Sequence, residues 1–190
     1  MPALPIDPAR TVVGVLGLGY VGLPLASAFC EAGFRVLGFD TDPDKIAALA
    51  RGENYLRHLG ADMTLQMRDS GRFEATGDFA RLAEPDAVLV CVPTPLGEHA
   101  EPDTSFIERS MEAIAAVLRP GQLVVLESTT YPGTTSELAR PILEKSGLAA
   151  GRDFLLAYSP EREDPGRKGY DTRSIPKLVG GTCEASGETA

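Results

Sequence analysis

Short apolar runs alternate along the chain with longer segments of helical periodicity. Five runs have the Val- and Leu-rich composition of strands that are buried on both faces of a parallel sheet. They lie at residues 12–16, 35–39, 86–92, 122–127 and 154–158. Two weaker strand candidates lie at residues 73–76 and 177–180.

Helices are predicted between these runs. The segments with helical patterns are residues 23–29, 43–51, 61–70, 105–118 and 136–145. Ser105 with Glu108, and Thr134 with Glu137, have the spacing of capping boxes at helix starts. Strands that alternate with helices of this length predict an α/β fold, a Rossmann-like doubly wound parallel sheet with helices on both faces. We interpret residues 1–190 as one such domain.

The first apolar run leads directly into a glycine-rich turn and then into a helix. The turn reads Gly17-x-Gly19-x-x-Gly22. Gly17 permits the tight turn, Gly19 lets a diphosphate approach the backbone, and Gly22 lets the helix pack close to the strand. The diphosphate would rest on free N–H groups at the positive end of the helix. The pattern predicts a dinucleotide site, and a glycine-rich turn without a ligand is the alternative.

An acidic residue, Asp40, follows the second apolar run. Its distance along the chain from the glycine turn is near the roughly 20 residues expected for the carboxylate that binds the ribose hydroxyls. A carboxylate there would repel a 2′-phosphate, so we predict NAD as the cofactor rather than NADP. Lys45 either reaches the ribose or a phosphate, or is a solvated helix residue.

Charge and composition restrict the possible partners. The formal net charge of −9 argues against nucleic acid and acidic membrane surfaces, because both require a basic surface. Residues 11–30 carry no charge, but the glycines and the proline inside this run fit a nucleotide-binding turn better than a membrane span. We therefore expect no nucleic-acid partner and no membrane partner.

Cysteine and histidine positions predict no metal site. Cys30, Cys91 and Cys183 form no C-x-x-C pair and no paired framework, which favours a reducing cytoplasm. His58 and His99 have no cysteine or acid at metal-ligand spacing, so we expect structural or solvent-facing roles for both.

Polar residues also follow the later apolar runs. Thr94, Thr129 and Glu161 come after the third, fourth and fifth runs. In an open parallel sheet the ligand binds beyond the carboxyl ends of the strands, so these residues are candidates for the site. Each has a structural alternative: Thr94 as a strand stop between prolines, Thr129 as a turn hydroxyl, and Glu161 as a solvated loop acid.

In their order along the chain, these segments resemble the nucleotide-sugar 6-dehydrogenases, the UDP-glucose/GDP-mannose dehydrogenase family. The resemblance covers essentially the whole chain. Its motifs are Gly17-Leu18-Gly19-Tyr20-Val21-Gly22-Leu23-Pro24, Val92-Pro93-Thr94-Pro95, Glu127-Ser128-Thr129 and Ser159-Pro160-Glu161-Arg162-x-x-Pro165-Gly166. The last motif is similar to the branch that acts on UDP-N-acetylhexosamines such as UDP-N-acetylglucosamine, since the UDP-glucose branch usually has Pro-Glu-Phe-x-x-Glu-Gly.

The resemblance implies a role for each matched residue. Besides the three glycines, the residues implied to contact NAD are Tyr20, Val21, Asp40, Lys45, Thr94 and Thr129. Glu161 would be the general base that positions or activates water, with Thr129 as a second catalytic residue. Arg162 and Glu163 would border the UDP-sugar, and a guanidinium suits its anionic diphosphate.

The reaction implied by the family is a double oxidation. The C6 alcohol of the sugar passes hydride to NAD, and a cysteine thiolate captures the aldehyde. A second NAD oxidises the thiohemiacetal to a thioester, and water releases the uronic acid.

The family's nucleophile lies in a Gly-Gly-x-Cys-x-Pro-Lys-Asp stretch of a second domain. Gly180-Gly181-Thr182-Cys183 matches it only in part, because Glu184-Ala185-Ser186 follow. We therefore expect Cys183 not to be the nucleophile, and Cys30 and Cys91 to be core thiols. This interprets the chain as the N-terminal NAD-binding domain of a longer dehydrogenase, inactive by itself and homo-oligomeric at full length.

Three alternatives stay open at this point. The first is a stand-alone NAD-binding or regulatory module without catalysis. The second is a nucleotide-sugar dehydrogenase for UDP-glucose or GDP-mannose. The third is another nicotinamide dehydrogenase with a similar first domain, although those families do not require Pro-Glu-Arg-x-x-Pro-Gly.

Overall fold

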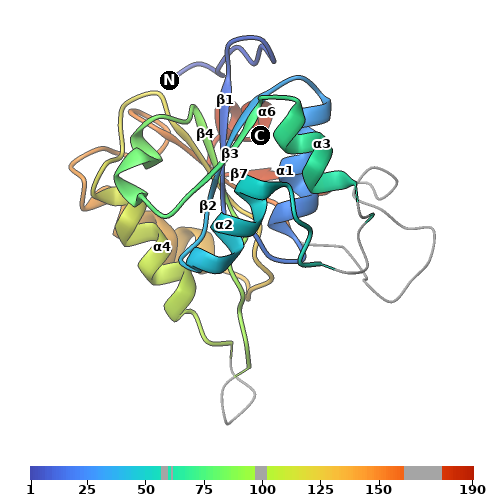
Figure 1. Ribbon diagram of the computed structural model, residues 1–190. Helices are drawn as coiled ribbons and strands as arrows, with labels where there is room; N and C mark the ends of the chain where they lie inside the picture. The colour runs from blue at the N-terminus through green and yellow to red at the C-terminus, as the bar shows by residue number, and fades with distance from the viewer. Residues whose placement is uncertain (57–59, 61, 97–101, 161–176) are drawn as a thin grey trace.

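A computed structural model describes residues 1–56, 60, 62–96, 102–160 and 177–190, and shows a seven-stranded sheet (Figure 1). The order is β3-β2-β1-β4-β5-β6-β7, with only β7 antiparallel to its neighbour. The strands are β1 (Val12–Leu16), β2 (Arg35–Phe39), β3 (Phe73–Thr76), β4 (Ala87–Val90), β5 (Leu123–Leu126), β6 (Leu155–Tyr158) and β7 (Gly180–Gly181). The predicted doubly wound parallel sheet is confirmed.

Helices cover both faces of this sheet, as Figure 1 shows for α1 and α3 on one side and α4 on the other. The helical segments are α1 (Gly22–Glu31), α2 (Pro43–Arg51), α3 (Met63–Asp69), η1 (Phe79–Ala83), α4 (Ser105–Ala115), η2 (Thr134–Ala139), α5 (Arg140–Glu144) and α6 (Glu184–Thr189). The short 3₁₀ turn η1 is not among the predicted helices. Its N-cap is Asp78, whose carboxylate accepts a hydrogen bond from the Ala80 N–H.

Two apolar clusters fill the space between the sheet and its helices. Adjacent residues of β4 show the division, because Leu89 belongs to one cluster and Val88 to the other. The first cluster also contains Leu23 of α1, and the second contains Met111 of α4. Since successive side chains of a strand point to opposite faces, an unbroken apolar run is what a sheet covered on both sides requires.

Strand β1 lies at the centre of the topology. It pairs with β2 on one side and with β4 on the other, with Leu16 opposite both Phe39 and Val90. The chain therefore winds outward in both directions from β1. In such sheets the crevice at this reversal, beyond the carboxyl ends of the strands, is where ligands bind.

The helix predicted at residues 136–145 is divided in two. A π-helical turn, η2, runs into α5. In a continuous α-helix the N–H of residue 141 would donate to the carbonyl of Glu137, but Pro141 has no N–H. The widened turn before Pro141 is consistent with this missing donor.

Neither predicted capping box forms. The first residue before α4 is Thr104, whose hydroxyl donates to Glu108 Oε1 at 2.7 Å. The helix starts one residue earlier than the Ser105–Glu108 spacing implies, and it ends at Ala115 rather than near residue 118. Thr134 is buried and donates to the carbonyl of Tyr131 at 2.8 Å instead of capping a helix.

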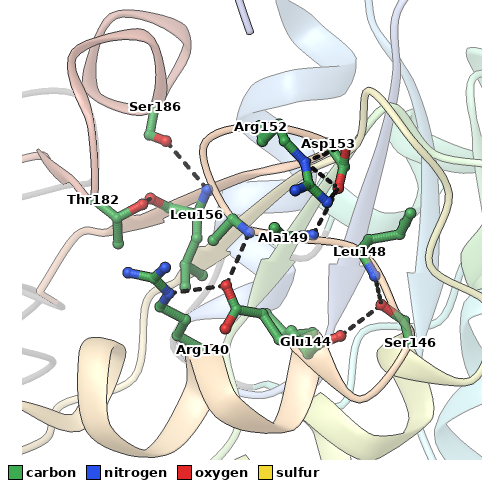
Figure 2. A network of polar contacts seen from close by, with 12 residues as sticks. Arg140, Glu144, Ser146, Leu148, Ala149, Arg152, Asp153, Leu156, Thr182 and Ser186 are labelled. Atoms are coloured by element: carbon green, nitrogen blue, oxygen red, sulfur yellow. Dashed lines mark hydrogen bonds and ion pairs between the residues drawn. The ribbon is translucent and has the colours of Figure 1, made fainter.

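Contacts with β6 hold the C-terminal segment in place. The Thr182 hydroxyl donates to the Leu156 carbonyl at 2.9 Å, and the Ser186 hydroxyl accepts from the Leu156 N–H at 3.3 Å (Figure 2). These contacts support β7 and α6, a helix that the small polar residues after Cys183 do not predict. The strand candidate at residues 177–180 is present only as the two-residue β7.

A buried glutamine joins β5 to the segment that precedes β4. The amide Nε2 of Gln122, a fully buried residue, donates to the carbonyls of Leu82 and Pro85, both at 2.8 Å. The Pro85 carbonyl also accepts a hydrogen bond from Arg119 at 2.9 Å. For the Leu82 carbonyl, the donor among the described residues is Gln122.

The Gln122→Leu substitution is expected to lower the free energy of unfolding by about 1–3 kcal/mol, because the buried carbonyl of Leu82 loses its donor. Urea denaturation followed by circular dichroism measures this change. The control is Gln66→Leu, the same substitution at an exposed position of α3. Equal effects of the two substitutions would contradict the role assigned to Gln122.

Candidate functional site

A cavity of about 850 Å³ lies over the carboxyl ends of β1, β2 and β4 and against α4. Its volume falls in the range of about 300–1,000 Å³ that is typical of ligand pockets. Six of the predicted cofactor residues line it: Gly17, Gly19, Tyr20, Val21, Asp40 and Lys45. The sequence-predicted site is therefore largely one physical space.

The three glycines of the turn have different surroundings. Gly17 has φ +93°, and a Cβ there would lie 2.7 Å from the Cys91 carbonyl oxygen. A Cβ at Gly22 would lie 1.8 Å from the carbonyl oxygen of Gly17. A Cβ at Gly19 would meet no atom within 4 Å. The fold itself thus requires glycine at Gly17 and Gly22, whereas the open space at Gly19 fits a diphosphate that approaches the backbone.

Asp40 is a buried carboxylate at the end of β2, with 8% of its surface exposed. Its Oδ2 accepts from the Leu18 N–H at 2.9 Å and from Lys45 Nζ at 3.2 Å, and its Oδ1 accepts from the Asp42 N–H at 3.0 Å. Asp40 therefore shapes the glycine turn and also places a negative charge on the cavity wall. Because the Lys45 side chain is 34% exposed, the ion pair contributes little to stability.

The start of α2 positions Lys45. Asp42 is the N-cap, and its Oδ1 accepts from the backbone N–H groups of Asp44 at 2.9 Å and Lys45 at 3.4 Å. Pro43 occupies the first turn, where the missing N–H costs nothing. These local bonds place the Lys45 side chain against Asp40, at the edge of the cavity.

A second group of predicted residues joins the ends of β4 and β5. Thr94 Oγ1 donates to the carbonyl of Thr129 at 2.6 Å, and Ser128 Oγ donates to the carbonyl of Val92 at 2.7 Å. Thr94 and Thr129 are thus in direct contact, although neither is among the residues that line the cavity. The hydroxyls of Thr94 and Ser128 thus both donate to backbone carbonyls of the neighbouring strand end.

The face of α4 that borders the cavity is not indicated by any of the sequence motifs. Phe106, Arg109, Ser110 and Ala113 line it, and the guanidinium of Arg109 lies 4.7 Å from the centroid of the Phe106 ring. Their spacing of i, i+3, i+4 and i+7 marks one side of a helix. That spacing is visible in the sequence, but it does not reveal which cavity the face meets.

Several predicted residues lie outside the described part of the chain. Glu161, Arg162 and Glu163 are among them, as are His58 and His99. Within the described ranges, no cluster of three or more His, Cys, Asp or Glu residues has the geometry to hold a metal ion. No helix in those ranges is both long and apolar enough to cross a membrane.

The cysteines lie in different environments. Cys183 packs beside Gly151, which precedes β6, so it lies near the amino ends of the strands, away from the cavity. Cys30 is a buried residue of α1, and this burial raises its pKa to about 11, which keeps it a protonated thiol. Cys91 is buried in the core where β4 ends, and it forms part of the cavity wall.

A glycine turn between β1 and α1, an acid at the end of β2 and a cavity at the reversal of strand order define a Rossmann-type dinucleotide-binding domain. Residues 11–190 match the profile of the UDP-glucose/GDP-mannose dehydrogenase family, NAD binding domain. The chain belongs to this family, and its cofactor is NAD.

Relatives and solved structures agree with this assignment. The chain is 40% identical to a UDP-N-acetyl-D-glucosamine 6-dehydrogenase of Pseudomonas aeruginosa, over 90% of this chain and 40% of the relative. It is 35% identical to a UDP-N-acetyl-D-mannosamine dehydrogenase of Pyrococcus horikoshii, over 94% and 43% of the two chains. The structure of an NDP-N-acetyl-D-galactosaminuronic acid dehydrogenase from Methanosarcina mazei superimposes with a TM-score of 0.87 at 40% identity, covering 94% of this chain and 40% of that one. The chain thus spans about 40% of the length of these relatives.

Gly19→Ala is expected to weaken NAD binding by about tenfold or more, because the new methyl group occupies space that the diphosphate needs. The free energy of unfolding should change little, since the added Cβ meets no atom within 4 Å. Isothermal titration calorimetry and urea denaturation measure the two quantities.

The matched variant is Gly22→Ala, whose Cβ would lie 1.8 Å from a backbone oxygen. It should destabilise the protein even without NAD. A Gly19→Ala protein that binds NAD normally would contradict the position assigned to the diphosphate.

The wild-type chain is expected to bind NAD at least about tenfold more tightly than NADP, because the Asp40 carboxylate repels a 2′-phosphate. Asp40→Asn should reduce this preference, as it removes the charge and retains the shape. Titration of both cofactors into each protein measures the ratio. Asp44→Asn, which removes an exposed carboxylate in the first turn of α2, is the control that should leave the ratio unchanged. Equal affinity of the wild type for both cofactors would rule out the role given to Asp40.

Proposed function

We propose that this chain is the NAD-binding domain of a UDP-N-acetylhexosamine 6-dehydrogenase, which oxidises the C6 alcohol of its sugar substrate to a carboxylate. The supporting observation is that dehydrogenases named for UDP-N-acetylglucosamine and UDP-N-acetylmannosamine match nearly the whole chain, at 40% and 35% identity. The Pro-Glu-Arg-x-x-Pro-Gly motif that begins at Pro160 favours the same branch.

In this proposal the chain's own residues would hold the cofactor at the point where the strand order reverses. The open backbone at Gly19 and the start of α1 bind the diphosphate. The Asp40 carboxylate accepts hydrogen bonds from the hydroxyls of the adenosine ribose. When bound, NAD supplies the hydride acceptor for both oxidations. Thr94 and Thr129, which join the ends of β4 and β5, border its reactive end.

The chemical step needs groups beyond those in the cavity. Glu161 acts as the general base for hydrolysis of the acyl intermediate, and Thr129 assists it. Arg162 and Glu163 contact the UDP-sugar, where a guanidinium matches the charge of the diphosphate. The nucleophilic cysteine belongs to the part of the relatives that this chain does not match. We further propose that the complete enzyme is a homo-oligomer.

A second candidate within the family concerns the substrate. Solved relatives include a GDP-mannose dehydrogenase from Pseudomonas aeruginosa and a UDP-glucose dehydrogenase from Pyrobaculum islandicum, at 30% and 27% identity. We rank these substrates second to a UDP-N-acetylhexosamine, because the motif that begins at Pro160 favours the UDP-N-acetylhexosamine branch and a relative named for UDP-N-acetylglucosamine is 40% identical. A purely regulatory NAD-binding module is the remaining alternative from a different class.

The 190-residue chain is expected to bind NAD but to form no NADH with any UDP-sugar, because we place the nucleophile in the part of the relatives that these residues do not match. The complete gene product should form two NADH per sugar with UDP-N-acetylglucosamine or UDP-N-acetylmannosamine. NADH absorbance measures both reactions, with UDP-glucose as the control substrate.

Each outcome separates the candidates. Turnover by the 190-residue chain would show that the nucleophile lies within it. A preference of the complete enzyme for UDP-glucose would contradict the assigned branch. A gene product that binds NAD and oxidises no nucleotide sugar would favour the regulatory module.

A further inference from the structure

Leu18, in the middle of the glycine turn, has both of its backbone polar groups held by distant side chains. Its N–H donates to Asp40 Oδ2 at 2.9 Å. Its carbonyl accepts from the hydroxyl of Tyr55 at 2.5 Å. The Leu18 side chain is fully buried in the core, so this residue is fixed at its side chain, its amide and its carbonyl.

The carbonyl of Leu18 and the N–H of Gly19 belong to the same planar peptide group. In a trans peptide these two groups point in opposite directions. The hydrogen bond from Tyr55 therefore sets the direction of the Gly19 N–H as well. Gly19 is the position where the backbone is open to the cavity, so the orientation of this peptide matters for a diphosphate.

Tyr55 comes from a segment that also builds the cavity. It follows α2 and is half-buried, and the next residue, Leu56, lines the cavity. The ammonium of Lys45 lies 6.0 Å from the centroid of the Tyr55 ring, and the same ammonium pairs with Asp40. Tyr55, Asp40 and Lys45 thus form a connected group around the turn.

The charge state of Tyr55 suits a permanent donor. Burial raises the pKa of its hydroxyl, and the nearby carboxylates of Asp40 and Asp42 raise it further. The phenol is therefore neutral near pH 7 and supplies the proton for the bond to Leu18 O. The carbonyl of Leu18 can only accept, so the direction of the bond is determined.

We propose that Tyr55 is a positioning residue for NAD, which acts through the Leu18 peptide to hold the Gly19 amide ready for the cofactor's diphosphate. Tyr55 complements Asp40 in this role. Asp40 orients the peptide group before Leu18, and Tyr55 orients the peptide group after it. A donor that is already oriented binds an anion without the entropic cost of ordering it. The inference rests on the NAD site described above and adds a residue that none of the sequence motifs contains.

The test is Tyr55→Phe, which removes only the hydroxyl and keeps the ring in its place beside Lys45. Two ligands are titrated: NAD, and adenosine, which has the base and ribose but no diphosphate. Calorimetry measures NAD binding and NMR chemical shifts measure adenosine binding. The dissociation constant of NAD should rise about tenfold, whereas that of adenosine should change by less than about twofold.

The control is Tyr131→Phe, which deletes a hydroxyl from a tyrosine that is 44% exposed. It should leave both affinities unchanged. Unchanged NAD affinity in Tyr55→Phe would overturn the proposal, and so would an equal loss for NAD and adenosine, because general loosening of the domain affects both ligands. A wild-type chain that binds NAD no more tightly than adenosine would instead overturn the NAD site itself.

A second measurement applies to the protein without ligand. Nitrogen-15 relaxation measured by NMR should give a lower order parameter for the Gly19 amide in Tyr55→Phe than in the wild type, because its peptide group is no longer fixed, with Val88 of β4 unchanged. An unchanged order parameter at Gly19 would contradict the proposal. Lower order parameters at both positions would show general loosening of the domain and would also overturn the assignment of a local role.

Discussion

The close packing of α1 against the end of β1 is the constraint on which the site depends. A Cβ at Gly22 would lie 1.8 Å from the carbonyl oxygen of Gly17, so the helix can approach the end of the strand this closely only because residue 22 lacks a side chain. Gly17 in turn lies against the Cys91 carbonyl at the end of β4. This packing directs the amino end of α1 to the crevice between the two halves of the sheet, where a helix terminus favours an anion.

The two halves of the sheet contribute differently to the site. The half formed by β1 and β2 supplies the open glycine backbone and the Asp40 carboxylate, which suit the adenosine diphosphate portion of NAD. The ends of β4 and β5 carry the Thr94–Thr129 contact, and the buried Glu127 at the end of β5 pairs with Lys177. Because Lys177 follows β6 and precedes β7, this ion pair ties the last part of the chain to the edge where the proposed chemistry occurs.

Local patterns were sufficient where a residue's role depends on its near neighbours. The apolar runs predicted the parallel strands, and the Gly17-x-Gly19-x-x-Gly22 spacing predicted the turn, because both depend on backbone geometry over a few residues. Patterns failed where a distant contact decides. The helix α6 forms on residues with little helical preference since Thr182 and Ser186 bond to Leu156 of β6.

By itself, the amino-acid sequence determined the fold class, the glycine turn, the acid at the end of β2 and, through its motifs, the family. Only the tertiary structure decided which residues share the cavity. Tyr55 meets Leu18 from 37 positions away in the chain, and Phe106 and Arg109 of α4 line the same cavity as the glycine turn. The physical reason is that strand and helix periodicity arises from local backbone geometry, whereas these contacts depend on how separate elements pack across the sheet.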